Sequence, residues 1–240
     1  MYKEKIGVVG GFGAYATLNF YKRILECFAS ESERNYPHII MDNNFTMPSR
    51  TRALLYHENY DEVVREITES VERLLDQQVD RIVLVCGTAH YFLDDIYRTI
   101  PQAKDKIVDI IEVLGAELMA QNEEQALIIA AEGALLKGLY PKRLEKYGIS
   151  CIIPSEEYYE KIRYFIECVK QNKLTENTAD AFYDFLQQFT SYNVVLGCTE
   201  FPILVKYIQE QPVIRYAEWE SFQFFDPMEL TIQYLKRTLV

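Results

Sequence analysis

Short apolar runs alternate with longer stretches of helical periodicity along the 240-residue chain. This alternation is typical of parallel strands that crossover helices cover on both faces. The expected strands are 6–9, 39–41, 82–85, 107–110, 127–130, 150–153 and 194–196. The pattern predicts an α/β fold with parallel, doubly wound sheets.

Each helical stretch has one apolar face. In the clearest stretch, Val63, Ile67, Val71 and Leu74 form a single stripe opposite a charged face, as in an amphipathic helix that lies on a sheet. The other helices are expected near 17–28, 156–169, 178–189 and 227–239.

The order of elements is duplicated. Segments 83–88 and 195–199 each place an apolar strand before a cysteine and a nearby threonine. We therefore expect two similar lobes with a cleft between them. The first would comprise residues 1–103 and 212–240, with the final helix crossing back to it, and the second would comprise residues 104–211.

Composition argues against several classes of protein. The chain has 25 Lys and Arg residues against 36 Asp and Glu residues, which gives a formal net charge of −11. Binding to nucleic acid or to an anionic membrane depends on dense basic residues, so neither partner is expected. No apolar stretch approaches the ~20 residues of a membrane helix, and the N-terminus lacks a signal-peptide pattern, so we expect a cytoplasmic protein.

Five cysteines are the unusual feature, because their number is odd, their spacing is wide and no Cys-x-x-Cys pair occurs. This argues against disulfide and zinc-ribbon frameworks. Cys86 and Cys198 follow expected strands, at the edge where parallel sheets bind ligands and where a helix start lowers a thiol pKa from roughly 8.5. Packing is the alternative for either one alone, and it is the preferred interpretation for Cys27, Cys151 and Cys168.

Two thiols that face each other across a cleft suit one type of reaction. One thiolate removes a proton from a carbon atom and the opposite thiol returns a proton to the other face, so the configuration inverts without a redox cofactor. Nucleophilic addition by sulfur is the competing role.

The glycine segment after the first strand does not predict a nicotinamide cofactor. Gly11-x-Gly13-x-x-Ala16 formally matches a dinucleotide fingerprint, but the nearest suitable acidic residue, Asp42, lies 29 residues after Gly13 instead of about 20. We prefer a tight turn whose backbone N–H groups face a small carboxylate.

No metal ion is predicted either. The three histidines are scattered, and Cys86-x-x-x-His90 is half a metal site at most. His90 is interpreted as a proton partner near Cys86, with a surface histidine as the alternative.

Several motifs together resemble the cofactor-independent aspartate/glutamate racemase superfamily, most closely its aspartate racemase branch, over essentially the whole chain. The resemblance rests on the opening strand with its glycine turn, an arginine-bearing loop, two cysteine motifs and three secondary landmarks. They are residues 6–13, 48–51, 86–90, 197–200, 138–140, 146–148 and 226–228. The resemblance implies two Rossmann-like lobes related by a pseudo-twofold axis, an active site in the interlobe cleft, and a homodimer.

The resemblance also implies roles for individual residues. Cys86 and Cys198 would be the paired acid and base, while His90 and Glu200 would tune proton transfer in their lobes. Arg50 would hold the distal carboxylate of an acidic amino acid, because a planar guanidinium suits that task; without the resemblance, Arg50 is interpreted as a solvated loop charge. The two threonines after the cysteines would help hold the substrate carboxylate. The full set of further substrate-binding predictions is Gly11, Gly87, Thr88, Glu132, Gly133, Lys161 and Thr199.

The sequence departs from the family pattern at substrate-holding positions. Gly87 stands where the first motif has asparagine, and Ala-Glu-Gly-Ala at 131–134 replaces a hydroxyl-rich Thr-x-Gly-Thr turn. Ser49 replaces an aspartate, and Lys161 is an approximate counterpart of a lysine that assists Arg50. Losing one polar partner from a desolvated site costs about 1–3 kcal/mol. We therefore hypothesise that the substrate differs from free aspartate.

The sequence thus predicts a cofactor-independent amino-acid racemase of the aspartate/glutamate type. One alternative is another two-cysteine relative, such as a hydantoin racemase or a maleate cis-trans isomerase. A second is a degenerate protein that binds small acids without turnover. Retention of both cysteines favours an enzyme, whereas the replaced 131–134 turn favours the binding protein.

Overall fold

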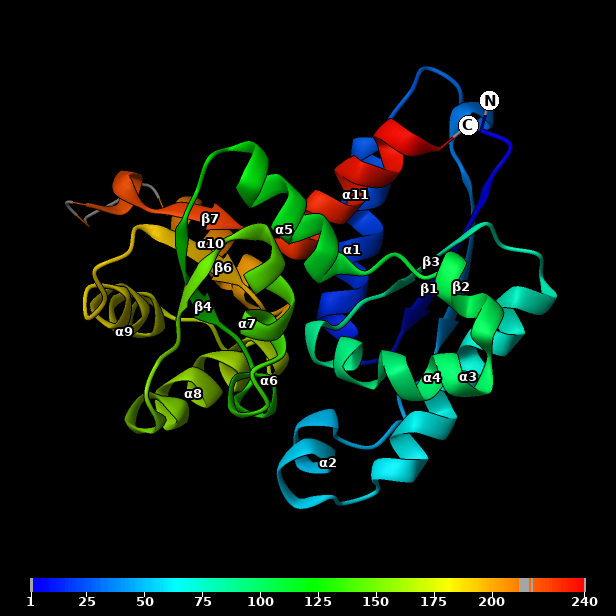
Figure 1. The fold of residues 1–240 in the computed structure, drawn as a ribbon. Helices are drawn as coiled ribbons and strands as arrows, with labels where there is room; N and C mark the ends of the chain where they lie inside the picture. The colour runs from blue at the N-terminus through cyan, green and yellow to red at the C-terminus, as the bar shows by residue number, and fades with distance from the viewer. Residues whose placement is uncertain (1, 212–215, 217, 240) are drawn as a thin grey trace.

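The chain folds into two lobes, each built on a parallel sheet (Figure 1). The computed structural model describes residues 2–211, 216 and 218–239. The first sheet has the strand order β2-β1-β3 and the second has the order β5-β4-β6-β7. The strands are β1 Lys5–Gly10, β2 His38–Asn43, β3 Arg81–Leu84, β4 Gln125–Ile129, β5 Ser150–Ile152, β6 Asn193–Leu196 and β7 Gln223–Phe225.

Helices cover both sheets, and all five predicted helices are present within a few residues of their expected bounds. The α-helices are α1 Ala14–Cys27, α2 Arg50–Tyr56, α3 Tyr60–Asp76, α4 Leu93–Thr99, α5 Ile110–Ala120, α6 Glu132–Leu136, α7 Leu139–Leu144, α8 Tyr159–Lys170, α9 Glu176–Leu186, α10 Phe201–Gln209 and α11 Pro227–Thr238. Short 3-10 helices occupy Glu33–Asn35, Gly87–Phe92, Pro101–Asp105, Glu145–Tyr147, Glu156–Tyr158 and Trp219–Ser221.

The strand order repeats between the lobes. In each sheet the first strand is central, the second lies on one side and the third on the other. In the first lobe Ile107 then forms a single parallel bridge with Ile82 of β3, at the place that β7 takes beside β6. The predicted strand at 107–110 is therefore wrong. The chain leaves the sheet there because the Asp109 side chain accepts a hydrogen bond from the Ile111 N–H at 3.0 Å and starts α5.

The C-terminal segment differs from the predicted assignment of 212–240 to the first lobe. β7 pairs with β6 and belongs to the second sheet. The final helix, α11, packs on α1 of the first lobe, in agreement with the predicted crossing of this helix back to that lobe. It also packs on α5 (Figure 1). Residues 212–215, 217 and 240 lie outside the described residues. The other lobe boundaries stay a prediction.

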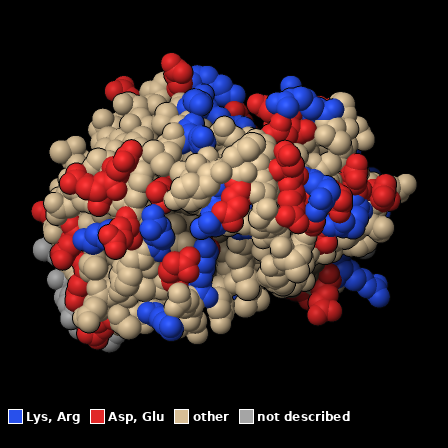
Figure 2. Space-filling view, turned by 90° about the horizontal axis from the view of Figure 1, so that it is seen from below, with Lys and Arg blue, Asp and Glu red and all other residues tan. Residues whose placement is uncertain are grey.

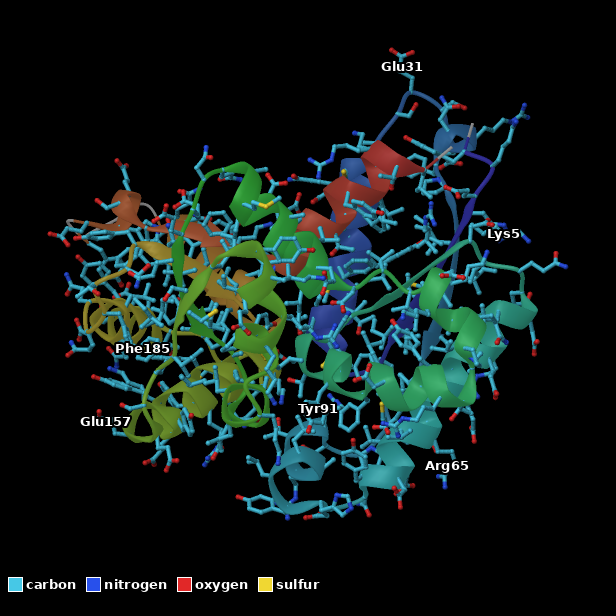
Figure 3. All side chains as sticks on the ribbon, in the orientation of Figure 1. Lys5, Glu31, Arg65, Tyr91, Glu157 and Phe185 are labelled. Carbon is cyan, nitrogen blue, oxygen red and sulfur yellow. The ribbon has the colours of Figure 1, made fainter. Side chains whose placement is uncertain are left out.

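Aromatic packing fixes the position of α8 against α9. The Phe165 ring of α8 lies 5.3 Å from Phe182 and 5.8 Å from Phe185 of α9, measured between ring centroids. Figure 3 shows Phe185 within the second lobe, whereas Arg65 and Glu157 lie at the surface. These buried rings hold α8 against α9, and this packing determines which side of α8 faces the first lobe. Over the described residues, no helix is both long and apolar enough to span a membrane.

Candidate active site

A cavity of about 400 Å³ opens between the lobes and is lined by both predicted catalytic cysteines. Cys86 lies two residues after the end of β3, and Cys198 lies two residues after the end of β6. Because β3 and β6 belong to different lobes, each lobe contributes one thiol to the cavity. Other lining residues come from the loop after β1, from α2, from the start of α6 and from α8. Basic and acidic side chains are interspersed over the face seen in Figure 2, so no broad field of one sign covers it.

Cys198 is held as a protonated thiol. Its Sγ donates a hydrogen bond to Glu200 Oε2 at 2.8 Å, and the Thr199 hydroxyl donates to the same oxygen at 3.3 Å. Burial raises the pKa of Cys198 well above its ordinary value, and Glu200 and Cys86 raise it further, so the lowering of the pKa predicted for a thiol at a helix start is wrong for Cys198. Glu200 therefore contacts the thiol directly, as its predicted supporting role requires.

His90 does not line the cavity and contacts the backbone of the first cysteine motif. Its Nδ1 lies 3.0 Å from the Cys86 carbonyl oxygen, and its Nε2 accepts a hydrogen bond from the Ile110 N–H at 3.4 Å. Burial lowers the pKa of His90, although Asp109 opposes the shift. The His90 ring is fully buried and neutral, so it can donate to the Cys86 carbonyl and accept from the Ile110 N–H. These two hydrogen bonds position the loop that carries Cys86. The geometry thus gives His90 a positioning contact rather than the predicted contact with a moving proton, and it also excludes a surface location.

Arg50 reaches the cavity but already has partners. It begins α2, where its Nη1 donates to the Pro48 carbonyl at 2.9 Å and its Nη2 donates to the Phe12 carbonyl at 2.5 Å. The guanidinium also lies over the Phe12 ring, 5.0 Å from the centroid. The predicted grip on a distal carboxylate would require these bonds to be exchanged.

The remaining predicted residues divide into two groups. Thr88, which is buried, Thr199, Gly87 and Glu132 line the cavity together with the cysteines. Gly133 instead packs behind it, where an added Cβ would lie 3.2 Å from both Thr51 Cα and Leu54 Cβ.

The glycine turn after β1 makes a neighbouring hollow. Gly11 has a φ of +84°, which favours glycine, and its N–H donates to the Thr17 hydroxyl at 3.2 Å. Asp42, the residue that a dinucleotide site would need, is paired with Arg73 at 2.8 Å. The turn borders a hollow that shares Phe12, Arg50 and Glu200 with the cysteine cavity, although Gly11 itself does not line that cavity.

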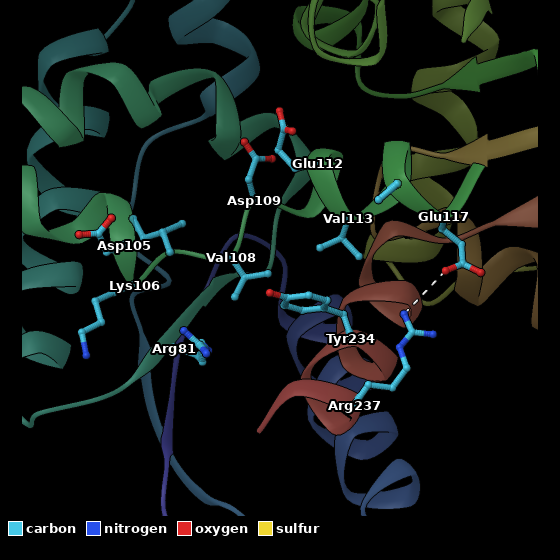
Figure 4. Close-up of a pocket in the computed structure, with 12 residues that line it drawn as sticks. Arg81, Asp105, Lys106, Val108, Asp109, Glu112, Val113, Glu117, Tyr234 and Arg237 are labelled. Atoms are coloured by element: carbon cyan, nitrogen blue, oxygen red, sulfur yellow. Dashed lines mark ion pairs between the residues drawn. The ribbon is translucent and has the colours of Figure 1, made fainter. Parts of the chain in front are cut away.

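A second cavity of about 350 Å³ lies beside β3, α5 and α11 and contains neither cysteine (Figure 4). Its wall mixes apolar residues such as Val113 with charged ones, including the Arg237–Glu117 ion pair at 3.7 Å. No cluster of three or more His, Cys, Asp or Glu residues suited to a metal ion occurs within the part of the chain that the structure describes. The chemistry suggested by the sequence therefore gathers at the interlobe cavity.

Known proteins share this fold. A sequence model described as Asp/Glu/Hydantoin racemase matches residues 9–235. The chain belongs to this family. Its fold is similar to that of Picrophilus torridus aspartate racemase, with a TM-score of 0.79, 20% sequence identity, and coverage of 98% of this chain and 94% of that one. The glutamate racemase of Francisella tularensis in complex with D-glutamate has a TM-score of 0.70 at 18% identity, covering 98% of this chain and 80% of that one.

Among curated sequences, the broad specificity amino-acid racemase RacX of Bacillus subtilis is 20% identical over 216 residues, which are 87% of this chain and 91% of that protein. Family membership places the protein among the amino-acid racemases, which are isomerases, and confirms the superfamily and the two-lobed α/β fold predicted from the motifs. The homodimer and the cytoplasmic location stay predictions.

The glycine that replaces the family's asparagine has a steric explanation. A Cβ atom on Gly87 would lie 2.4 Å from the Gly197 carbonyl oxygen and 2.6 Å from the Tyr140 hydroxyl. The Tyr140 hydroxyl donates to that same carbonyl at 2.8 Å. A buried tyrosine thus occupies the space between the two cysteine loops, and a side chain at position 87 has no room. The sequence identified Tyr140 only as a landmark of the family.

Replacing Tyr140 by phenylalanine is expected to destabilise the protein by about 1–3 kcal/mol, because the buried Gly197 carbonyl loses its donor. Denaturant unfolding measures this change. Tyr183→Phe is a suitable comparison, because its hydroxyl accepts hydrogen bonds from the Gln187 side chain and the Glu218 N–H, neither of which belongs to a cysteine loop. An unfolding free energy for Tyr140→Phe equal to that of the parent protein would contradict the assignment.

The cavity has a lysine, but it is Lys170 and not the predicted Lys161. Position 170 is on the helical face of α8 that also carries Arg163 and Glu167 into the cavity wall, whereas Lys161 is absent from that wall. Although burial lowers the pKa of Lys170, Glu200 and Cys198 raise it, and the net shift is upward. The helical spacing of 163, 167 and 170 was the available sequence signal.

The replaced 131–134 turn also has a counterpart in the structure. Glu132 forms an ion pair with Arg163 at 2.6 Å, joining α6 to α8 across the cavity wall. The 131–134 turn thus has the carboxylate of Glu132 in place of the family's two hydroxyls, and this carboxylate is already paired with the Arg163 guanidinium.

Proposed function

We propose that the protein racemises a free amino acid by moving the α-proton between Cys86 and Cys198. The observation that supports this most is that the two thiols leave equivalent strands of the two lobes and line one cavity. A base from each lobe suits removal of the proton on one face of the α-carbon and its return on the other. The exchange leaves the oxidation state of the substrate unchanged, so it needs no redox cofactor.

The electrostatics of the site favour the protonated form of Cys198. Burial raises the pKa of Cys198, and the charges of Glu200 and Cys86 add to that effect. Because two interacting acids resist ionising together, loss of a proton from one thiol holds the other protonated. In the proposed cycle, the Cys86 thiolate takes the α-proton of one enantiomer, and the Cys198 thiol donates its proton to the opposite face. The reverse direction uses the same groups with exchanged protonation states.

Substrate binding is proposed to use the polar groups next to each cysteine. Thr88 and Thr199 line the cavity and would donate hydrogen bonds to the substrate carboxylate. Glu200 would hold the Cys198 thiol in position through the hydrogen bond that it accepts.

A deuterium-exchange panel tests the proposal. The protein is incubated in D2O with single enantiomers of alanine, methionine, leucine, phenylalanine, aspartate, glutamate and lysine, and separately with substituted hydantoins and maleate. Mass spectrometry then detects α-deuterium, and chiral chromatography detects inversion. Exchange with inversion of an amino acid supports the proposal. Turnover restricted to hydantoins or maleate, or ligand binding without any turnover, would overturn it in favour of those alternatives.

Replacing Glu200 by glutamine is expected to move the pH profile. The Glu200 charge raises the pKa of Cys198, so the neutral amide lowers that pKa. Where turnover needs the Cys198 thiolate, kcat/KM rises as pH passes this pKa, and the rise should therefore occur at lower pH in the variant. The matched control is Glu167→Gln, a lining carboxylate that does not bond to Cys198. An unmoved profile for Glu200→Gln would contradict the assigned contact.

A further inference from the structure

The cavity wall beyond the cysteines is largely apolar. α2 contributes Leu55 and Tyr56, and α8 contributes Tyr159, Ile162 and Ile166. The three α8 residues lie three and four positions apart, so they form one stripe along the helix. Tyr56 is 66% exposed, which leaves an aromatic ring available at the rim of the cavity.

The basic groups of the wall already have partners, but those of Arg50 are uncharged. Both of its terminal nitrogens donate to backbone carbonyls, while its buried Nε has no hydrogen-bond partner among the described residues. The other three bases each pair with a carboxylate. These pairs are Arg52–Glu58, Arg163–Glu132 and Lys170–Glu167. A second carboxylate on a substrate would have to displace one of these partners.

The reacting end of the wall contains a carboxylate that disfavours such a substrate. Of the three glutamates that line the cavity, Glu132 and Glu167 are paired with Arg163 and Lys170, whereas Glu200 accepts hydrogen bonds from the Cys198 thiol and the Thr199 hydroxyl. Glu200 is only 4% exposed and lies beside Cys198, so its charge is weakly screened at the reacting end of the site. A carboxylate on the substrate side chain thus meets the charge of Glu200 near the reacting centre and apolar side chains farther along the wall.

We propose that the substrate is an amino acid with a bulky, uncharged side chain, such as methionine, leucine or phenylalanine. This inference rests on the proposed racemisation. A cavity of about 400 Å³ accommodates such a side chain, which would lie between Leu55 and Tyr56 of α2 and the α8 stripe. Contact with these residues removes apolar surface from water on both molecules. This class differs from the acidic amino acid that the family resemblance implies.

Specificity constants from the α-deuterium assay test this class. We expect kcat/KM for methionine, leucine or phenylalanine to exceed those for aspartate, glutamate and lysine by about tenfold or more, in line with the discrimination that an apolar pocket provides. Alanine serves as the reference, because it has an α-proton but no side chain that reaches the wall. A preference for aspartate, glutamate or lysine overturns the substrate class and leaves the racemase proposal standing. Absence of exchange with every amino acid overturns the racemase proposal itself.

Two variants locate the preference in the wall. Tyr56→Ala and Leu55→Asn are each expected to reduce the methionine-to-alanine ratio of kcat/KM by about tenfold, mainly through KM. Tyr164→Ala is the matched control, because Tyr164 is an exposed α8 tyrosine, 45% accessible, outside the cavity lining. A ratio that stays constant in both wall variants, with thermal unfolding confirming that they are folded, would overturn the assignment of this wall to the side chain.

Discussion

Replacing either Cys86 or Cys198 by serine is expected to reduce kcat/KM for racemisation by about 10²–10⁴-fold, the usual contribution of a positioned acid or base. A hydroxyl is close in size to a thiol but far less acidic, so the cavity keeps its shape while one proton carrier is lost. Steady-state racemisation of the best amino acid, followed by chiral chromatography, measures the effect in both directions.

The control for this prediction is Cys168→Ser. Cys168 is a partly buried thiol of α8 that does not line the cavity, so its replacement should leave kcat/KM within about twofold. Because the proposed mechanism uses Cys86 and Cys198 in one step, the double variant should be hardly slower than either single variant. Full activity in either single variant would remove that cysteine from the mechanism.

Replacing Gly87 by alanine is expected to destabilise the protein by about 1–3 kcal/mol and to impair catalysis together with folding. The added methyl group would lie 2.4 Å from the Gly197 carbonyl oxygen, a backbone atom that moves only with the Cys198 loop. The substitution thus separates the loops that carry the two thiols. Differential scanning calorimetry gives the stability change, and kcat/KM at a temperature where the variant is folded gives the effect on the site.

Gly148→Ala distinguishes site displacement from general instability. Gly148 has a φ of +74° and an added Cβ there would meet no atom within 4 Å. Its substitution therefore introduces backbone strain of about 1–2 kcal/mol far from the cysteines. We expect this variant to lose stability while its kcat/KM stays unchanged. An active, stable Gly87→Ala protein would contradict the steric account of this family departure.

Local patterns were sufficient for most of the fold. Apolar runs of three or four residues located six of the seven strands, and the repeated strand–cysteine–threonine order predicted the duplication seen in the strand orders. The run at 107–110 failed because the capping carboxylate of Asp109 starts a helix where hydrophobicity alone indicates a strand. The short strand β7 was missed because its three residues carry too little pattern.

The site was predictable where it depends on position along a strand and less so where it depends on contacts between lobes. Cys86 and Cys198 were found because each follows a parallel strand of its own sheet, at the carboxyl end where such sheets bind ligands. The partners of Arg50 depend on how α2 packs, which no short motif encodes. The helical spacing of Lys170 marks one face of α8 but does not show that this face lines the cavity. The same holds for Tyr140, whose hydroxyl reaches Gly197 across 57 positions of sequence.

The central claim, that the two thiols act as separate bases, is tested most directly by the isotope content of the first product molecules in D2O. A fully protiated single enantiomer is supplied, and substrate and product are separated and weighed by mass spectrometry before much substrate is consumed. The account predicts that the product enantiomer carries one α-deuterium, because the donating thiol has exchanged with solvent, while recovered substrate retains its α-hydrogen. A product that retains the original hydrogen would show that a single base removes and returns the same proton, and would contradict the account.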